Sequence, residues 1–281
     1  MLSINIRGFG VKGKFGWVKN ICFKERPDII AIQETKCRFL GDGWFHNLLG
    51  NDNCGFVQKE ASGNSGGMLL VWDTNSFVVE SAVKSDYYLA IRGKWCGSGH
   101  ESIIVNVYGP HSDVKKQEMW FALDSLLRSI DSAWVVCGDF NEVRNQSDRL
   151  SCDFHQCRAT RFNDFITMNN LIEIPINGKR FTRISDDGTK FSKLDRFFVD
   201  DKYISHWNDL SVVALERRES DHCPLMLRDK IVDFGPKPFK IFDEWFKKEG
   251  VDQVIHDSWA KSVDSWKKGL FISRLAKKCE K

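Results

Sequence analysis

The chain has 281 residues, of which 42% are hydrophobic, so it can bury the core of one large or two small α/β domains, and this composition excludes a disordered protein. Its nine cysteines are scattered without a CxxC pair, which argues against a zinc site or a disulfide framework and favours a reduced, intracellular protein. The net charge of +3 comes from the segment 228–281, and the near-neutral remainder excludes a protein that coats nucleic acid.

Short apolar runs separated by Gly, Asn and Asp predict many strands interrupted by a few helices. In chain order, the pattern predicts strands near 2–5, 28–33, 54–59, 67–72, 76–83, 87–95, 101–108, 133–138, 194–199, 210–215 and 222–228. Helices are predicted over 14–25, between the first two strands, and over 113–130 and 156–170 on either side of strand 133–138. This mixed order argues against a simple parallel Rossmann sheet, and neither a GxGxxG nor a GxxxxGK[ST] loop occurs.

The predicted helix over 113–130 has one apolar stripe. Its residues at three- and four-residue spacings are Trp120, Leu123, Leu127 and Ile130, with Lys115, Lys116 and Asp124 between them. This spacing predicts one buried face.

The composition of the sequence changes after about residue 230. Gly-Pro-Lys-Pro at 235–238 is followed by several aromatic residues and a lysine-rich amphipathic stretch. We therefore predict a folded domain over 1–230 and a basic, partly helical connector over 231–281.

Polar side chains follow several of the predicted strands at the point where each strand ends, the usual location of functional groups in α/β proteins. Asn5 follows the first strand, and Glu34 closes the second, where a carboxylate is well placed to bind a hard cation. Asp139 and Asn141 end the strand over 133–138. Each position also has a structural interpretation, because a carboxylate after a strand commonly caps a helix and Asp-x-Asn commonly forms an Asx turn.

Four more residues are candidates for the same edge. Tyr108 ends the strand over 101–108 and either brings its hydroxyl to the edge or packs in the core. Asp195 interrupts an apolar run, where an unpartnered charge is costly, so it requires a His, an Arg or a metal as partner. Asp221 and His222 supply such a group, since an imidazole held by a carboxylate is a typical oriented acid or electrostatic stabiliser, although a lone histidine is commonly structural. No GxSxG elbow supports a serine hydrolase.

Six motifs together resemble the endonuclease/exonuclease/phosphatase superfamily in residue type, order and spacing. They are Asn-Ile-Arg-Gly at 5–8, Gln-Glu-Thr-Lys at 33–36, Asn-Val-Tyr-Gly-Pro at 106–110, Gly-Asp-Phe-Asn at 138–141, Leu-Asp-Arg-Phe at 194–197 and Ser-Asp-His-Cys-Pro at 220–224. Within this superfamily, the chain most resembles the endonuclease domain of plant-type non-LTR (LINE-like) retrotransposon polyproteins, through phrases such as Ser-Gly-Gly-Met-Leu-Leu-Val-Trp-Asp at 65–73. The resemblance covers about residues 1–230.

The resemblance implies a four-layered α/β sandwich of two mixed β-sheets flanked by helices, with the site at one end of the sheets. It implies Mg²⁺, with Mn²⁺ as the alternative, held by Glu34 with Asn5 and Asp221.

The catalytic roles that it implies fall on the other candidates. Asp139 and Asn141 would orient and deprotonate the attacking water, and Tyr108 would contact the phosphate. His222, held by Asp195, would stabilise the charge that develops there. Contacts with the substrate are further implied for four residues, namely Arg7, His111, Thr182 and Ser192.

The implied function is that of a DNA-nicking endonuclease whose 3′-hydroxyl product primes reverse transcription. Its partners would be double-stranded DNA and, in a full-length element, a C-terminal reverse transcriptase. Candidate regions for base recognition are 179–190 and 144–149. The alternatives are an abasic-site repair endonuclease or phosphatase of the same fold, and a catalytically degenerate nucleic-acid-binding fragment.

Arg7 departs from the family pattern, since many relatives carry Asp or Asn two positions after the asparagine that Asn5 matches. This substitution weakens a two-metal interpretation and favours either a backbone-phosphate contact by Arg7 or a degenerate copy of the element.

No apolar run approaches the roughly 18 residues of a membrane span, and no signal-peptide core follows Met1. We therefore expect an intracellular protein without membrane contact, nuclear when it acts on chromosomal DNA and cytoplasmic otherwise.

Overall fold

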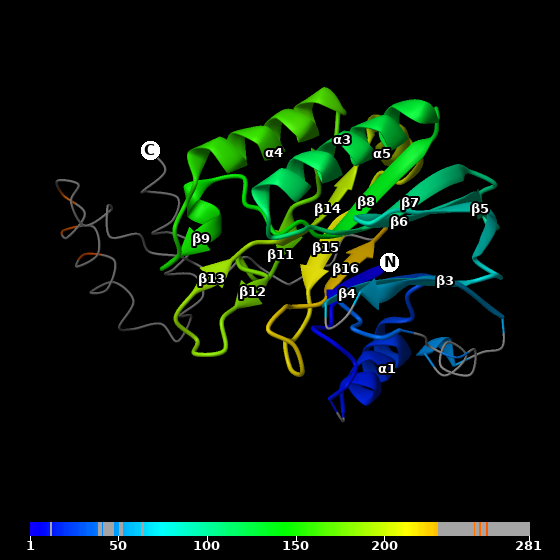
Figure 1. Cartoon of the computed structure of the whole chain (residues 1–281), viewed down its shortest axis with the longest axis horizontal. Coiled ribbons are helices and arrows are strands. Elements are labelled where there is room, and N and C mark those ends of the chain that lie inside the picture. The colour runs from blue at the N-terminus through cyan, green and yellow to red at the C-terminus, as the bar shows by residue number, and fades with distance from the viewer. Residues whose placement is uncertain are drawn as a thin grey trace. The chain divides into compact units, whose positions relative to one another are not determined.

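The computed structural model describes residues 1–11, 13–38, 41, 48–50, 53–62, 65–229, 250, 253 and 257 (Figure 1). The chain divides into two compact units, Met1–Ile231 and Val232–Lys281. The connector predicted over 231–281 lies almost entirely outside the described residues. Within the second unit, Gln253 Nε2 donates a hydrogen bond of 2.9 Å to Asp257 Oδ1. The fold and the site below are those of the first unit.

The first sheet has seven strands in the order β11-β15-β16-β1-β2-β4-β3. Their bounds are Leu2–Asn5 (β1), Ile29–Gln33 (β2), Cys54–Ser62 (β3), Ser65–Asp73 (β4), Ile176–Asn177 (β11), Ser211–Ala214 (β15) and Leu225–Arg228 (β16). Strand β1 runs parallel to β2 and antiparallel to β16. The first strand of the chain therefore lies inside the sheet, between the second strand and the last.

The second sheet has six strands in the order β10-β14-β8-β7-β6-β5. Their bounds are Phe77–Lys84 (β5), Tyr88–Trp95 (β6), Glu101–Tyr108 (β7), Ala133–Asp139 (β8), Ile172–Glu173 (β10) and Asp195–Val199 (β14). Only β7 and β8 pair in parallel; the other neighbours are antiparallel. A small third sheet joins Arg183–Ile184 (β12), Phe191–Ser192 (β13) and Arg149–Leu150 (β9).

Helices cover the outer faces of the two large sheets (Figure 1). Helices α3 (Asp113–Ser129) and α4 (Gln156–Met168) lie side by side on the second sheet, and α1 (Lys14–Glu25) lies on the first. A short helix α5 (Asp201–His206) follows β14, and a 3-10 turn spans Gln146–Asp148. None of the helices in the described part of the chain is long and apolar enough to cross a membrane.

The side-chain alternation of the strands separates three apolar layers. In β2, Ile29 and Ala31 face the layer between the two sheets, whereas Ile30 and Ile32 face α1. Strand β8 repeats this pattern: Val135 packs between the sheets, and its neighbour Val136 packs under α3 and α4. The predicted four-layered sandwich of two mixed sheets flanked by helices is confirmed.

The predicted long elements correspond closely to the observed ones, and the short ones were missed. Strands β9 to β13 and helix α5 have no predicted counterpart. The strand predicted over 222–228 begins only at Leu225, and His222 lies before it, in an isolated bridge with Arg183. His222 is therefore held by side-chain contacts and one bridge instead of a strand ladder.

Candidate functional site

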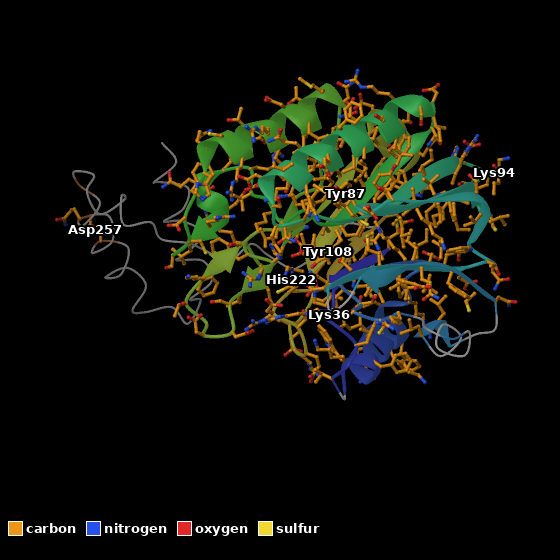
Figure 2. The ribbon with its side chains drawn as sticks, in the orientation of Figure 1. Lys36, Tyr87, Lys94, Tyr108, His222 and Asp257 are labelled. Carbon is orange, nitrogen blue, oxygen red and sulfur yellow. The ribbon has the colours of Figure 1, made fainter. Side chains whose placement is uncertain are left out.

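Strand pairing brings the predicted polar residues to one end of the two sheets. Tyr108 stands opposite Asp139 in the parallel pair β7–β8, and Asp139 stands opposite Asp195 in the antiparallel pair β8–β14. In the first sheet, Asn5 stands opposite Gln33, so that Glu34 follows directly beside it. Figure 2 labels Tyr108 and His222 at this end.

Most of the predicted site residues line one cleft at this end. Those that line it are Asn5, Arg7, Glu34, His111, Asp139, Asn141, Ser192, Asp221 and His222. Among the other predicted residues, Asp195 lies directly behind His222, and Tyr108 interacts electrostatically with Glu34 and Asp139. One cleft thus contains side chains from both sheets.

The carboxylate of Asp139 is the centre of the site and is buried. Its Oδ2 accepts a hydrogen bond of 2.9 Å from Asn5 Nδ2, and its Oδ1 accepts one of 2.8 Å from the Asn141 backbone. His222 Nε2 lies 3.9 Å from Oδ2. Burial raises the pKa of Asp139, the negative charge of Asp195 adds to this rise, and the positive charge of His222 opposes it. A raised pKa suits a carboxylate that takes a proton near neutral pH.

His222 is buried and held from several sides. Its Nδ1 lies 2.8 Å from Asp195 Oδ2, and its backbone N–H donates to Ser220 Oγ at 3.1 Å. Burial lowers the pKa of His222, but the carboxylates of Asp195 and Asp139 outweigh burial and raise it above its ordinary value. The ring is therefore protonated at neutral pH and presents Nε2 as a charged donor.

The structure corrects the assignment of Thr182. This side chain, predicted to contact substrate, is completely buried, and its Oγ1 accepts hydrogen bonds of 3.0 Å from the backbone N–H groups of Leu194 and Asp195. Thr182 fixes the start of β14 and hence Asp195, because a buried N–H group needs an acceptor.

Glu34 directly follows the end of β2, and Tyr108 is the last residue of β7. Glu34 has a left-handed backbone (φ 54°), and its Oε1 lies 2.9 Å from Lys36 Nζ. Burial raises the pKa of Tyr108, and the negative charges of Glu34 and Asp139 raise it further. Tyr108 therefore keeps its proton and is a hydrogen-bond donor at neutral pH.

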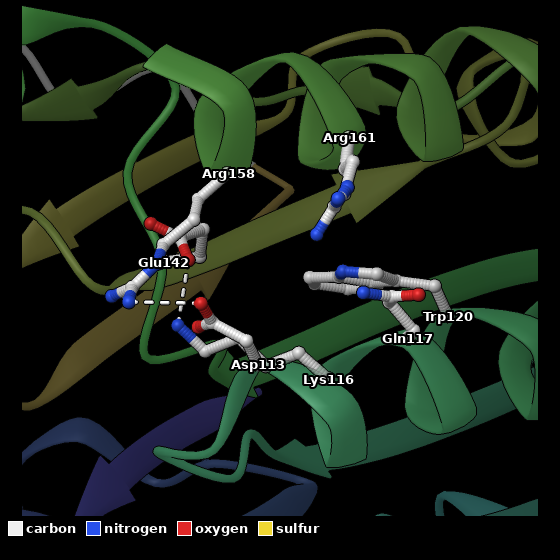
Figure 3. Close-up of a pocket in the computed structure, with 7 residues that line it drawn as sticks. All are labelled: Asp113, Lys116, Gln117, Trp120, Glu142, Arg158 and Arg161. Atoms are coloured by element: carbon white, nitrogen blue, oxygen red, sulfur yellow. Dashed lines mark hydrogen bonds and ion pairs between the residues drawn. The ribbon is translucent and has the colours of Figure 1, made fainter. Parts of the chain in front are cut away.

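Lys116 is a site residue that the sequence did not reveal. It was expected outside the buried stripe of its helix, but it is buried, and its Nζ donates to Asn141 O at 2.7 Å and to Glu142 Oε2 at 2.6 Å (Figure 3). Its burial could have been inferred from its position four residues before Trp120, because this spacing puts both side chains on one helix face. Lys116 thereby holds the segment that carries Asn141, whose Nδ2 also donates to Gly109 O at 2.7 Å.

Asp221 is bound by two guanidinium groups, and no sequence motif predicted these contacts. Arg183 Nε lies 3.1 Å and Arg7 Nη1 3.5 Å from Asp221 Oδ2. The other oxygen, Oδ1, is buried and has no hydrogen-bond partner among the described residues. Ser220, also missed, donates from Oγ to Asn5 O at 2.7 Å and joins this segment to β1.

His111 and Ser192 line the cleft, but they differ in exposure. His111 is exposed, whereas Ser192 is buried, with its Oγ 3.7 Å from Cys152 Sγ. Arg149 and Arg158 also line the cleft, and Arg158 forms an ion pair of 2.9 Å with Asp113 (Figure 3). These two arginines make their side of the cleft basic. The spacing of residues in the sequence did not predict that β9 and α4 would lie at the site.

The oxygen donors of the cleft fit a divalent cation. Ligand atoms of Asp139, Asp195 and His222 lie within 4.8 Å of one another. The raised pKa of His222 opposes a metal there, because a metal binds neutral imidazole. The Glu34 carboxylate and the unpartnered Asp221 Oδ1 are the hard donors that Mg²⁺ prefers, so they fit the ion better.

Comparison with known proteins agrees with this geometry. The model of the Endonuclease/Exonuclease/phosphatase family matches residues 2–222. Among similar solved structures, an AP endonuclease from Leishmania major has 15% identity and a TM-score of 0.65, with 80% of this chain and 86% of that chain covered. A 3′ phosphatase from Neisseria bound to product DNA hairpin has 18% identity and a TM-score of 0.62, with 81% and 97% covered.

A third similar structure is the endonuclease domain of TRAS1, a telomere-specific non-LTR retrotransposon. It has 14% identity and a TM-score of 0.59, with 80% of this chain and 95% of that chain covered. None of the curated proteins matches the sequence. At these identities the solved structures support the fold.

Proposed function

We propose that this chain, which belongs to the endonuclease/exonuclease/phosphatase family, is a metal-dependent endonuclease that nicks double-stranded DNA. Family membership supports a metal-dependent phosphodiester hydrolase, and the finer assignment to DNA is ours. The observation that carries it is the buried Asp139 carboxylate between the Asn5 amide and the protonated His222 ring. A base and a charged donor at one cleft are what the hydrolysis of a phosphodiester requires.

In the proposed mechanism, Asp139 takes a proton from the attacking water, whose oxygen bonds to phosphorus as the bond to the 3′ oxygen breaks. Asn141 orients this water, and His222 donates a hydrogen bond to the phosphoryl oxygen on which charge develops. Asp195 keeps the ring oriented and charged. The 3′ oxygen leaves as an alkoxide and takes a proton from solvent water, so the products are a 5′-phosphate and a 3′-hydroxyl.

Mg²⁺, or Mn²⁺ in its place, would be held by Glu34 with Asn5 and Asp221 and would polarise a phosphoryl oxygen. Tyr108 would donate a hydrogen bond from its hydroxyl to the phosphate. Arg7, His111 and Ser192 would contact the rest of the substrate, since all three line the cleft.

We further propose that the domain over 1–230 is the nicking module of a non-LTR retrotransposon. The six sequence motifs and the likeness to the TRAS1 endonuclease domain support this role. Its 3′-hydroxyl product would prime a reverse transcriptase joined through the segment 231–281, and the protein would act in the nucleus.

The first test is the nicking of supercoiled plasmid in Mg²⁺. His222→Ala and Glu34→Ala are each expected to lower the nicking rate by about 10²- to 10⁴-fold, the range of a positioned charged or acid–base group. His206→Ala, which removes an exposed histidine from α5, is the matched control and should nick like the wild type. Equal nicking by all these proteins would refute the assignment of the site.

The similar AP endonuclease and 3′ phosphatase structures favour a second candidate, a repair enzyme of the same fold. Cleavage of abasic duplex in preference to intact plasmid would support this candidate.

Arg7 motivates a third candidate, a degenerate fragment that binds DNA without cutting it. Salt-sensitive duplex binding without metal-dependent cleavage would identify it.

A further inference from the structure

We propose that the cleft contains a second anion site, built from Arg7 and Arg183, which binds a non-scissile backbone phosphate of the substrate and which the Asp186 carboxylate occupies in the free protein. The inference rests on the proposed function for the source of the phosphate. It adds an internal ligand that competes with the substrate.

Arg7 is presented to the cleft by a fixed backbone. Its φ of 52° is left-handed, its N–H donates to Asn5 Oδ1 at 2.9 Å, and its carbonyl accepts from Lys14 Nζ at 3.0 Å. The side chain beyond this anchor is 42% exposed and lines the cleft. The guanidinium group is therefore held at the rim, where a ligand can reach it.

Asp186 binds Arg7 from a distant part of the chain. It lies in the turn between β12 and β13, and its Oδ1 and Oδ2 are 2.7 Å and 3.0 Å from Arg7 Nη1. The turn does not need this carboxylate, because the backbone bond from Ser185 N to Lys190 O closes it at 2.9 Å and Asp187 binds Thr189. The Asp186 carboxylate is therefore not needed to close the turn, and it binds Arg7 instead. The Asp186 side chain is 73% exposed.

Positive charge surrounds this contact. Arg183 binds Asp221 at 3.1 Å, and Arg217 donates from Nη1 to Ile184 O at 3.2 Å. The hydrogen bond and charge of Arg7, followed by the charges of Arg183 and Arg217, lower the pKa of Asp186. When Asp186 leaves, Arg7 and Arg183 keep one carboxylate within ion-pair distance among the described residues, that of Asp221, and the site attracts another anion.

A phosphate can replace the carboxylate at little cost. Guanidinium groups bind the oxygens of carboxylates and phosphates with the same geometry. An exposed ion pair contributes little to stability, so the release of Asp186 does not oppose binding strongly. Because Arg7 and Arg183 line the same cleft as His222, the phosphate in this site belongs to a nucleotide next to the scissile bond.

The test measures duplex binding without metal, so that cleavage plays no part. In EDTA, fluorescence anisotropy with a labelled duplex oligonucleotide compares the wild type with Asp186→Asn over a series of salt concentrations. Asp186→Asn is expected to lower Kd by about two- to fivefold, the value of one exposed ion pair. The slope of log Kd against log salt should steepen by about one unit, since the wild-type carboxylate takes up one cation when the phosphate displaces it, and the neutral side chain of Asp186→Asn does not.

Two control comparisons distinguish the freeing of the anion site from the effect of removing one negative charge from the protein. Asp131→Asn removes another exposed carboxylate, paired with Lys202 near the start of β8, and should leave Kd unchanged. In an Arg7→Gln background, Asp186→Asn should also have no effect. The same gain from Asp131→Asn, or a gain that persists with Arg7→Gln, would overturn the proposal.

Inorganic phosphate as a probe separates this inference from the proposed function. Phosphate should raise the Tm of Asp186→Asn more than that of the wild type, whatever the protein does with DNA. If the wild type fails to bind or cut duplex while this phosphate effect is found, the nuclease assignment fails and the anion site stands. Equal phosphate effects on both proteins would refute the anion site alone.

Discussion

Four residues that line the cleft, Arg7, Glu34, Lys36 and Asn141, have left-handed backbones although none is glycine. Such a conformation costs on the order of 1–3 kcal/mol and persists where surrounding contacts compensate for it. Two buried lysines do so here: Lys14 donates to the carbonyl of Arg7, and Lys116 donates to that of Asn141. Each of these residues comes shortly after the end of a strand and lines the cleft.

The pH profile of kcat/KM tests the electrostatic coupling of Asp195 to Asp139 and His222. The negative charge of Asp195 raises the pKa of both Asp139 and His222, so Asp195→Asn should lower both pKa values. The acid limb requires ionised Asp139 and the alkaline limb requires protonated His222, so both limbs should move to lower pH. We also expect a fall in rate of about 10²-fold.

Initial rates on a duplex oligonucleotide between pH 5 and about pH 10 measure the two limbs. Asp195→Glu keeps the charge and should retain the wild-type limbs. Limbs that move in opposite directions would contradict the assigned roles.

Among the elements, the short strands β9, β10, β12 and β13 are fixed by contacts distant in sequence. Glu173 at the end of β10 accepts hydrogen bonds of 2.5 Å from Lys193, 2.6 Å from Arg196 and 2.8 Å from Arg144. It thus joins β10 and β14 to the loop after β8. Burial raises the pKa of Glu173, but the charges of Arg196 and Lys193 outweigh it and lower the pKa to about 2.

Glu173 should therefore make the unfolding free energy depend on pH. Because its pKa is lower in the folded state, its contribution is present above the unfolded value of about 4.3 and is lost as pH falls toward about 2. Glu173→Gln should cost about 2–3 kcal/mol at pH 7 and lose this dependence. Urea denaturation at pH 7, 4 and about 2.5 measures it, with Glu216→Gln as a control that should unfold like the wild type.

The short strands also show where prediction from sequence ends. The long strands and helices were predicted because their apolar residues repeat over enough positions to reveal a period, whereas two residues show none. The strand-end candidates were predicted because polar groups such as Asp195 interrupt apolar runs. Arg183 and Asp186 lie in the region 179–190 that was a candidate for base recognition, but their contacts with Asp221 and Arg7 could not be predicted, since these partners are far away along the chain.

At the scale of the whole folded unit, a buried polar network joins the two sheets across the apolar layer between them. Gln33 Nε2 donates to Asn106 Oδ1 at 2.6 Å, and Asn106 Nδ2 donates to the carbonyls of Ile32 and Leu69 at 3.0 Å each. These bonds align β2 with β7, and so Glu34 with Tyr108. A buried network of this kind favours one arrangement of the sheets, because any shift leaves polar groups unpaired.

Asn106→Ala should therefore destabilise the protein by about 2–4 kcal/mol, since it removes three hydrogen bonds and opens a cavity. Ser102→Ala on the same strand removes only the acceptor for Trp95 Nε1 and should cost about 1 kcal/mol. Urea denaturation of both variants compares the losses. A smaller loss for Asn106→Ala than for Ser102→Ala would show that the contact does not hold the sheets together.

The hydrogen bond between Ser220 and Asn5 spans 215 residues and has a consequence for protein synthesis. Within this unit, strand β1 is made before the other strands but finds its neighbour β16 only when the last part of the unit has been made. Until then one edge of β1 stays open, and neither His222 nor Asp221 can reach Asn5 and Asp139. A nascent chain that ends before this segment therefore has no complete centre, and we expect cleavage to begin only after translation has passed the whole unit.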